Sequence, residues 1–135
     1  PRPRRWCLDA TADYYALGYT CVVRGVQVED QQGLREVDEI LAVDGLTALF
    51  IGTGDLTLSS GLPASHPDND ALIDFALAAC RTAGVPCGTA VGDSAAAGVA
   101  VDRGFKFVMV SNDATIFATA ARNLIRGLDE TRRRI

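Results

Sequence analysis

Residues 46–55, LTALFIGTGD, contain an apolar run that stops at a glycine turn followed by an acid. The run Ala48-Leu49-Phe50-Ile51 has no polar residue between its apolar ones, which is typical of a strand with both faces buried. Such strands occur in parallel sheets that are covered by helices. A second strand-length run, residues 20–28, also stops at an acid, Glu29. These two segments predict an α/β fold built on a parallel sheet.

Strand-length and helix-length patterns alternate along most of the chain. The predicted strands cover residues 20–28, 46–52, 86–91 and 105–110. The predicted helices, with apolar residues three and four apart, cover residues 31–43, 67–84, 94–103 and 114–127. This alternation fits two architectures, namely about four strands of a TIM-type (βα)8 barrel and an open, doubly wound parallel sheet. The sequence has no glycine-rich nucleotide loop, which slightly favours the barrel half.

The length and composition indicate one domain. The 135 residues are 48% hydrophobic, which is enough to form a buried core. We predict an N-terminal tail and helix over residues 1–19, the βα units over residues 20–128, and a basic tail over residues 129–135. Since the chain starts at Pro1 rather than at a methionine, we also expect it to be a processed or excised piece of a longer protein.

Charge and cysteine spacing argue against several classes of protein. A net charge of -4 argues against nucleic acid as the main partner, because phosphate binding requires a basic surface. No apolar run approaches the ~20 residues that span a bilayer, so we expect no membrane partner and a cytoplasmic location. The 4 cysteines show no C-x-x-C spacing, which argues against a zinc cluster or a disulfide framework. We expect them to behave as small hydrophobic residues.

Two acids stand where predicted strands end: Glu29 and Asp55. The carboxyl ends of parallel strands open onto the same edge of a sheet, so we expect these carboxylates to converge on one point. Carboxylate oxygens are hard ligands that suit a magnesium- or manganese-type ion. Gln27 is predicted to face the same side as Glu29, because side chains alternate along a strand. The alternative is structural: Glu29 would cap the following helix, and Asp55 would end a loop.

Other polar positions give weaker signals. Gly52 and Gly54 belong to a turn whose backbone N–H groups are able to hold a carboxylate or phosphate oxygen. We interpret the single histidine, His66, as a helix-start residue rather than as an acid or base. Asp93 and Asp113 precede predicted helices, and we interpret both as N-caps.

Three motifs, in this order and spacing, carry a family resemblance. VQVE (26–29), VDEILAV (37–43) and LFIGTGDL (49–56) resemble the HpcH/HpaI aldolase and citrate lyase family. The similarity continues through GFKFVMVSND (104–113) and covers roughly residues 20–126. The resemblance implies the C-terminal half of a phosphoenolpyruvate/pyruvate-type (βα)8 barrel, belonging to a metal-dependent, class II pyruvate aldolase.

The resemblance also implies roles for individual residues. Glu29 and Asp55 match the ligands of a divalent metal, which would be Mg²⁺, Mn²⁺ or Co²⁺. Gln27 matches the amide that contacts the bound 2-oxo acid, and it is the catalytic candidate. The backbone segment that binds the substrate carboxylate in the family, the carboxylate cradle, corresponds here to Gly52, Thr53, Gly54 and Asp55. Thr53 stands where the family usually has proline. We expect threonine to make the loop less rigid and to leave the backbone N–H donors in place.

The implied reaction is reversible cleavage of a 4-hydroxy-2-oxo acid to pyruvate and an aldehyde through a metal-stabilised enolate. The only lysine, Lys106, lies in a predicted strand, which agrees with a reaction that needs no Schiff base. Two alternatives stay open: an acyl-CoA lyase of the citrate or malyl-CoA type, and a non-catalytic half-barrel that serves in assembly. The family's enolate-neutralising arginine and acid–base histidine belong to the other half of the barrel. We therefore expect the remaining barrel half, or a second copy in a homo-oligomer, to supply them.

Overall fold

The computed structural model describes residue 18, residues 21–63 and residues 65–132. The helix expected before Gly18 lies outside these residues, as do most of the two basic clusters near the chain ends. Among the described helices, none combines the length and the apolar content needed to cross a membrane.

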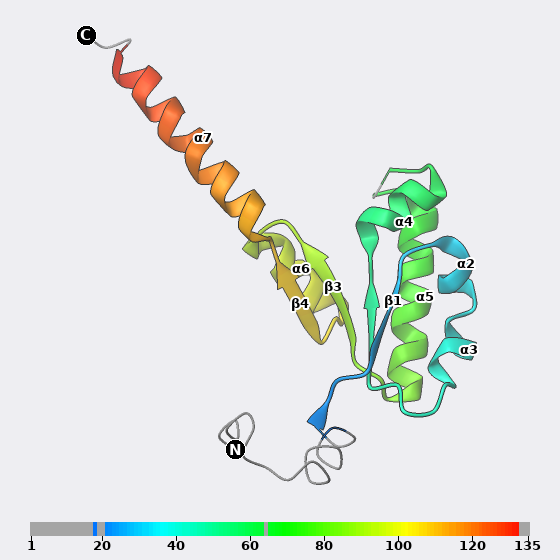
Figure 1. Ribbon diagram of the computed structural model, residues 1–135. Coiled ribbons are helices and arrows are strands. Elements are labelled where there is room, and N and C mark those ends of the chain that lie inside the picture. Colours follow the sequence, from blue (N-terminus) through cyan, green and yellow to red (C-terminus); the bar gives the residue numbers. More distant parts are fainter. Residues whose placement is uncertain (1–17, 19–20, 64, 133–135) are drawn as a thin grey trace, which may run out of the picture.

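The sheet consists of β1 (Gly25–Val28), β2 (Ala48–Ile51), β3 (Cys87–Val91) and β4 (Phe107–Val110). All pairings are parallel, and the strand order is β1-β2-β3-β4 (Figure 1). Each strand of the described chain pairs with the next in sequence, as in a barrel, whereas a doubly wound sheet reverses its strand order at a switch point. The structure therefore confirms the parallel βα units of a TIM-type barrel. The strands are shorter than the apolar runs that predicted them.

Six helices connect and follow these strands in the described chain. They are α2 (Gln31–Arg35), α3 (Val37–Leu41), α4 (Thr53–Ser60), α5 (Pro67–Ala83), α6 (Ser94–Arg103) and α7 (Asp113–Arg132). The single helix predicted over residues 31–43 is wrong in detail, because the chain breaks it into α2 and α3 at Glu36. The prediction of a turn and loop after β2 is also wrong, since α4 occupies that segment. Glycine, serine and threonine are weak helix formers, so the sequence pattern of this segment did not indicate a helix.

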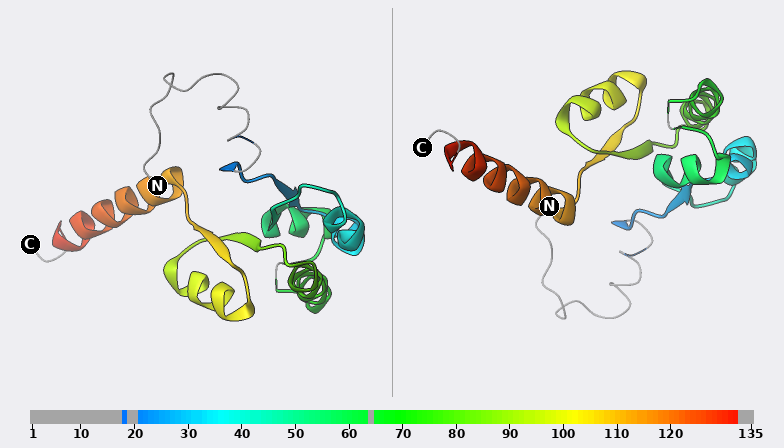
Figure 2. Two further views of the ribbon diagram at one scale, coloured as in Figure 1. Left: turned by 90° about the horizontal axis from the view of Figure 1, so that it is seen from below. Right: turned by 90° about the horizontal axis from the view of Figure 1, so that it is seen from above.

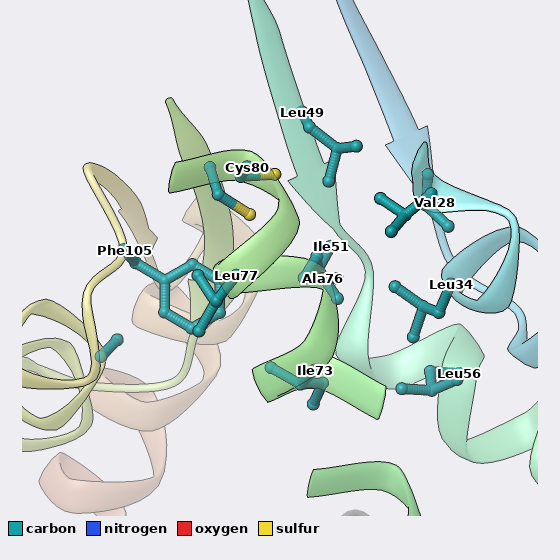
Figure 3. Packing of buried hydrophobic residues seen from close by; sticks show 13 residues of the cluster. Val28, Leu34, Leu49, Ile51, Leu56, Ile73, Ala76, Leu77, Cys80 and Phe105 are labelled. Atoms are coloured by element: carbon teal, nitrogen blue, oxygen red, sulfur yellow. The ribbon is translucent and has the colours of Figure 1, made fainter. Parts of the chain in front are cut away.

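The hydrophobic core lies between the sheet and α5. Val28, Leu49 and Ile51 project from the strands toward the apolar side of α5 (Figure 3). Leu49 and Ile51 are 0% exposed, and they meet Ile73 and Leu77 among other residues of that helix. Burying one such side chain stabilises the fold by about 1.5–3 kcal/mol. We call the sheet surface formed by Val28, Leu49, Ile51 and Cys87 the covered face; α5 and α6 lie on the same side of the sheet (Figure 2).

The opposite surface of the sheet is uncovered in the described chain. We call it the open face; it is formed by Gln27, Phe50, Gly88, Phe107 and Met109, which the strand register places side by side. Phe107 is 39% exposed and Met109 is 55% exposed. The Phe50 and Phe107 rings lie 6.1 Å apart across β3, where a Cβ on Gly88 would stand only 2.1 Å from the Phe107 ring. The aromatic pair therefore needs glycine at this position.

Capping groups fix where the helices begin. Asp93 accepts a hydrogen bond from the Ala96 N–H (2.8 Å), so the N-cap prediction for Asp93 agrees with the structure. The same prediction for Asp113 is wrong. Asn112 accepts from the Thr115 N–H (2.8 Å), and Asp113 is already the first residue of α7. The α7 helix projects away from the sheet (Figure 1).

Candidate metal and substrate site

The carboxyl end of β1 carries the first two site candidates. Side chains alternate along the strand, so Gln27 and Glu29 face the open side while Val28 enters the core. The Gln27 Nε2 donates a hydrogen bond to Glu29 Oε2. Gln27 is exposed and Glu29 is half-buried. The structure thus brings together the amide and one of the two carboxylates that the sequence paired.

Glu29 does not cap the helix that follows it. The cap of α2 is Asp30, whose Oδ1 accepts a hydrogen bond from the Gly33 N–H at 2.7 Å. The structural alternative for Glu29 is therefore wrong. A half-buried carboxylate that is not needed at a helix end requires another explanation, because burial of its charge costs free energy.

Gly52 packs directly against this pair. A Cβ on Gly52 would lie 2.9 Å from the Glu29 Cβ, 3.1 Å from Glu29 Oε2 and 3.0 Å from Gln27 Nε2. The Gly52 N–H also donates to the Val28 carbonyl at 2.9 Å, which extends the β1–β2 pairing by one residue. Any side chain at this position would occupy the space beside the carboxylate. Gly52 therefore keeps both polar groups accessible from the helix that it begins.

The remaining candidates form the first turn of α4. Gly52 is the N-cap of α4, and as a glycine it has no side chain that could cap the helix. The first helical bond runs from the Leu56 N–H to the Gly52 carbonyl at 3.0 Å. The N–H groups of Thr53, Gly54 and Asp55 precede that bond, so they have no partner within the helix. Three such donors, together with the helix dipole, favour an anion. The expected cradle is thus the start of a helix rather than a flexible turn.

Asp55 is exposed and lies in the first turn of α4. It follows Gly52 by about 4.5 Å along the helix axis, at the usual rise of 1.5 Å per residue. Glu29 touches Gly52 directly, and Gly52 is the N-cap of the helix that carries Asp55, so the two carboxylates lie on adjacent elements. Asp55 also stabilises α4 through the helix dipole, by about 0.3–1 kcal/mol. Its structural alternative, the end of a loop, is wrong because the loop is a helix.

The described residues contain no group of three or more His, Cys, Asp or Glu side chains able to hold a metal ion. Glu29 and Asp55 offer hard oxygen donors and leave most of a coordination sphere to other groups. Magnesium-type ions are commonly held in this way, by one or two carboxylates with water and substrate in the other positions. The donor set therefore fits such an ion.

Two further residues are placed away from this chemistry. The His66 Nδ1 accepts from the Asp68 N–H at 3.2 Å and caps α5, in agreement with its interpretation as a helix-start residue. Lys106 directly precedes β4, at the amino end of the sheet and thus opposite Glu29. Neither residue is a member of the site.

The sequence did not identify the apolar neighbours of the site. Strand register continues from Ile51 opposite Thr89 to Gly52 beside Ala90, and Ala90 pairs with Met109. Ala90 and Met109 therefore share the layer of the open face that contains Glu29 and Gly52. When all residues of a strand are apolar, the sequence does not indicate which of them face a site. The strand register in the structure does indicate it.

Comparison with known proteins shows that the chain is similar to aldolases over most of its own length. The family model described as HpcH/HpaI aldolase/citrate lyase matches residues 14–120. A hydroxypyruvate/pyruvate aldolase of Sagittula stellata is 39% identical over 98 residues, which are 71% of this chain and 39% of that protein. A 2-dehydro-3,6-dideoxy-6-sulfogluconate aldolase of Pseudomonas putida is 35% identical over 76% of this chain and 41% of its own length.

Solved structures give the same result. The crystal structure of an HpcH/HpaI aldolase/citrate lyase family protein from Burkholderia cenocepacia superposes with a TM-score of 0.80 at 35% identity, covering 87% of this chain and 46% of that one. The HpcH/HpaI aldolase of Desulfitobacterium hafniense superposes with a TM-score of 0.81 at 25% identity, over 96% of this chain and 49% of that one. The chain thus spans about half the length of these relatives, or less.

Proposed function

Because the chain belongs to the HpcH/HpaI aldolase/citrate lyase family, we propose that it forms the metal-binding half of a class II pyruvate aldolase. The reaction would cleave a 4-hydroxy-2-oxo acid to pyruvate and an aldehyde. The observation that carries this proposal is the packing of Gln27 and Glu29 against Gly52, at the start of α4. It joins a carboxylate, an amide and a set of backbone N–H donors at one end of the sheet.

Glu29 and Asp55 are the proposed ligands of a divalent ion, Mg²⁺ or Mn²⁺, with Co²⁺ as a third choice. When bound, such an ion supplies the positive charge that stabilises an enolate formed from pyruvate. The residues fit this role because Glu29 packs against Gly52, the N-cap of α4, and Asp55 lies in the first turn of that helix.

The polar groups of the chain would orient the 2-oxo acid. The backbone N–H groups of Thr53, Gly54 and Asp55 would bind its carboxylate at the start of α4. Threonine at position 53 contributes an N–H that proline would lack. Gln27 uses one amide hydrogen to hold Glu29 in place, and its other amide hydrogen is available for a substrate oxygen.

The open face supports the proposal that other βα units complete the protein. Phe107 and Met109 are apolar and exposed there, and β1 and β4 are unpaired at their outer edges in the described chain. Parallel strands of a barrel are buried on both faces and paired at both edges. The remaining half of the barrel, or a second copy of this chain, would cover this surface and supply the enolate-neutralising cation and the acid–base group.

An assay of pyruvate formation tests the proposed activity. In one assay, the purified protein is incubated with 4-hydroxy-2-oxo acids and Mn²⁺, and the rate of pyruvate formation is measured. In a second assay, the protein is incubated with pyruvate and Mn²⁺, and the rate of exchange of the pyruvate methyl protons is followed by NMR. We expect Glu29→Gln to lower both rates at least about 100-fold, because the variant keeps the shape and removes the charge. The matched control is Asp93→Asn, which removes a carboxylate from another strand end and keeps a good N-cap. Equal rates in both variants would contradict the proposed role of Glu29.

The same preparation separates the alternative activities. An acyl-CoA lyase would cleave a CoA thioester and leave free 4-hydroxy-2-oxo acids intact. A non-catalytic half-barrel would bind Mn²⁺ with no proton exchange, even when all units of the barrel are present. The relatives compared above are named as aldolases, which favours the 4-hydroxy-2-oxo acid as substrate.

A further inference from the structure

A cavity of about 280 Å³ opens at the amino end of the sheet, remote from Glu29 at its carboxyl end. Its rim includes the exposed residues Arg81 and Lys106, and its lining includes the buried residues Cys80 and Cys87. Cys80 lies in the last turn of α5, and Cys87 is the first residue of β3. The cavity therefore connects solvent with two thiols from adjacent elements.

The two thiols form a pair. Cys80 is 1% exposed and Cys87 is 2% exposed, and both belong to one buried cluster and line the same cavity. The neighbouring Cys87 thiol lowers the pKa of Cys80, against the opposing effect of burial. The neighbouring Cys80 thiol and burial both raise the pKa of Cys87. Cys80 is therefore the thiol that ionises first, whereas the Cys87 thiol donates a weak hydrogen bond to the Gly88 carbonyl oxygen at 3.9 Å.

The surroundings favour a reactive pair over two inert packing residues. A buried cysteine usually behaves as a small hydrophobic side chain that contacts other apolar groups on all sides. Here both thiols border a cavity large enough for several water-sized molecules, and the positive charges of Arg81 and Lys106 stand at its rim. A thiol that borders such a cavity can be reached by a small oxidant, which reacts with its thiolate form.

We propose that Cys80 and Cys87 are an oxidisable dithiol, which a small hydroperoxide entering this cavity converts into a disulfide. The Cys80 thiolate attacks one peroxide oxygen, the O–O bond breaks, and the departing hydroxide takes up a proton to give water and a Cys80 sulfenic acid. The Cys87 sulfur then displaces the sulfenic hydroxyl, and the Cys87 proton leaves with it as a second water. The two thiols lose two electrons, which reduce the peroxide.

Peptide mapping tests the proposal directly, because trypsin cleaves after Arg81, between the two cysteines. Folded protein is treated with hydrogen peroxide, alkylated without reduction and digested. We expect peptide 36–81 to be joined to peptide 82–103, with a mass about 2 Da below their sum, and to be released by reduction. The other two cysteines, Cys7 and Cys21, share peptide 6–24 and serve as an internal control. Protein that is unfolded in urea before oxidation should lose this preference for one pair.

Single substitutions assign the order of the two thiols. Cys87→Ser should allow a sulfenic acid at Cys80 to be trapped with dimedone, whereas Cys80→Ser should leave Cys87 unmodified. Circular dichroism verifies that each variant is folded, and the wild-type map does not depend on either variant. The proposal is overturned if both thiols stay fully alkylatable at a peroxide concentration that oxidises Cys21. It is also overturned if Cys80 proceeds to sulfinic acid with no joined peptide.

Discussion

The two faces of the same sheet differ in what surrounds them. On the covered face, Leu49 and Ile51 are 0% exposed and pack on α5. On the open face, Phe107 and Met109 come from an equally apolar strand and remain in contact with solvent. Gln27 and Glu29 belong to the open face, so the exposed apolar residues of the sheet and the candidate site lie on one surface. Any unit that covers the open face would therefore also lie beside the candidate site.

The largest effect is expected from a truncation on the covered face. Leu49→Ala should lower the free energy of unfolding by about 2–5 kcal/mol, because it leaves a cavity in the packed core. Met109→Ala is the matched truncation on the open face, and in this chain alone it should cost less than about 1 kcal/mol. Urea denaturation of both variants measures the difference. Similar costs would show that the open face is already covered in the isolated chain.

A smaller loss is expected where the open face is packed most tightly. Gly88→Ala should destabilise the protein by about 1–3 kcal/mol, since the new Cβ overlaps the Phe107 ring. Phe107→Leu in the same chain should recover part of this loss by removing the obstructing ring. Gly98→Ala, in α6 with nothing within 4 Å of the new Cβ, is the control and should stabilise the helix by up to about 1 kcal/mol. Thermal melts of the four proteins provide the comparison.

Next in size is an effect on binding rather than on folding. Gly52→Ala places a Cβ 2.9 Å from the Glu29 Cβ and should weaken Mn²⁺ binding about 10- to 100-fold by displacing that side chain. Gly54→Ala, two residues further along α4, meets nothing within 4 Å and should keep the affinity of the wild type. Calorimetric titration with Mn²⁺ compares them. Equal affinities would remove Gly52 from the site.

The smallest effect separates two neighbouring acids. Asp30→Ala should cost about 1 kcal/mol of stability, because it removes the cap of α2, and it should leave Mn²⁺ affinity unchanged. Glu29→Gln should leave the stability unchanged and weaken Mn²⁺ binding. Denaturant unfolding and Mn²⁺ titration of each variant give four values, and a stability loss in Glu29→Gln matching that of Asp30→Ala would return Glu29 to a structural role.

Much of this arrangement could be predicted from the sequence, because its signals are local. The apolar run at residues 48–51, the helix start at His66-Pro67 and the helix end at Gly84 are properties of a few adjacent residues, and β2 and α5 appear where they were expected. The alternation of Gln27, Val28 and Glu29 predicted which side chains would share a side of β1. These features depend on backbone geometry alone.

Other features depend on the precise path of the backbone or on packing, and the residue types alone do not reveal them. The choice of Asp30 over Glu29 as the cap of α2 is decided by backbone geometry at one residue, and both are acids. The α4 helix begins at a glycine and contains weak helix formers, so packing of Leu56 rather than propensity accounts for it. The placement of Cys80 and Cys87 beside one cavity requires the return of the chain from α5 to β3.

The most direct test of the proposed site is Mn²⁺ binding to Asp55→Asn, measured by the loss of the free-ion electron paramagnetic resonance signal. Asp55→Asn keeps the size of the side chain at the start of α4 and removes its charge. Asp93→Asn is titrated in parallel as the control that removes one carboxylate elsewhere at this end of the sheet. If Glu29 and Asp55 hold one ion, Asp55→Asn abolishes binding while Asp93→Asn binds as the wild type does. Unchanged Mn²⁺ affinity in Asp55→Asn would contradict the shared metal site.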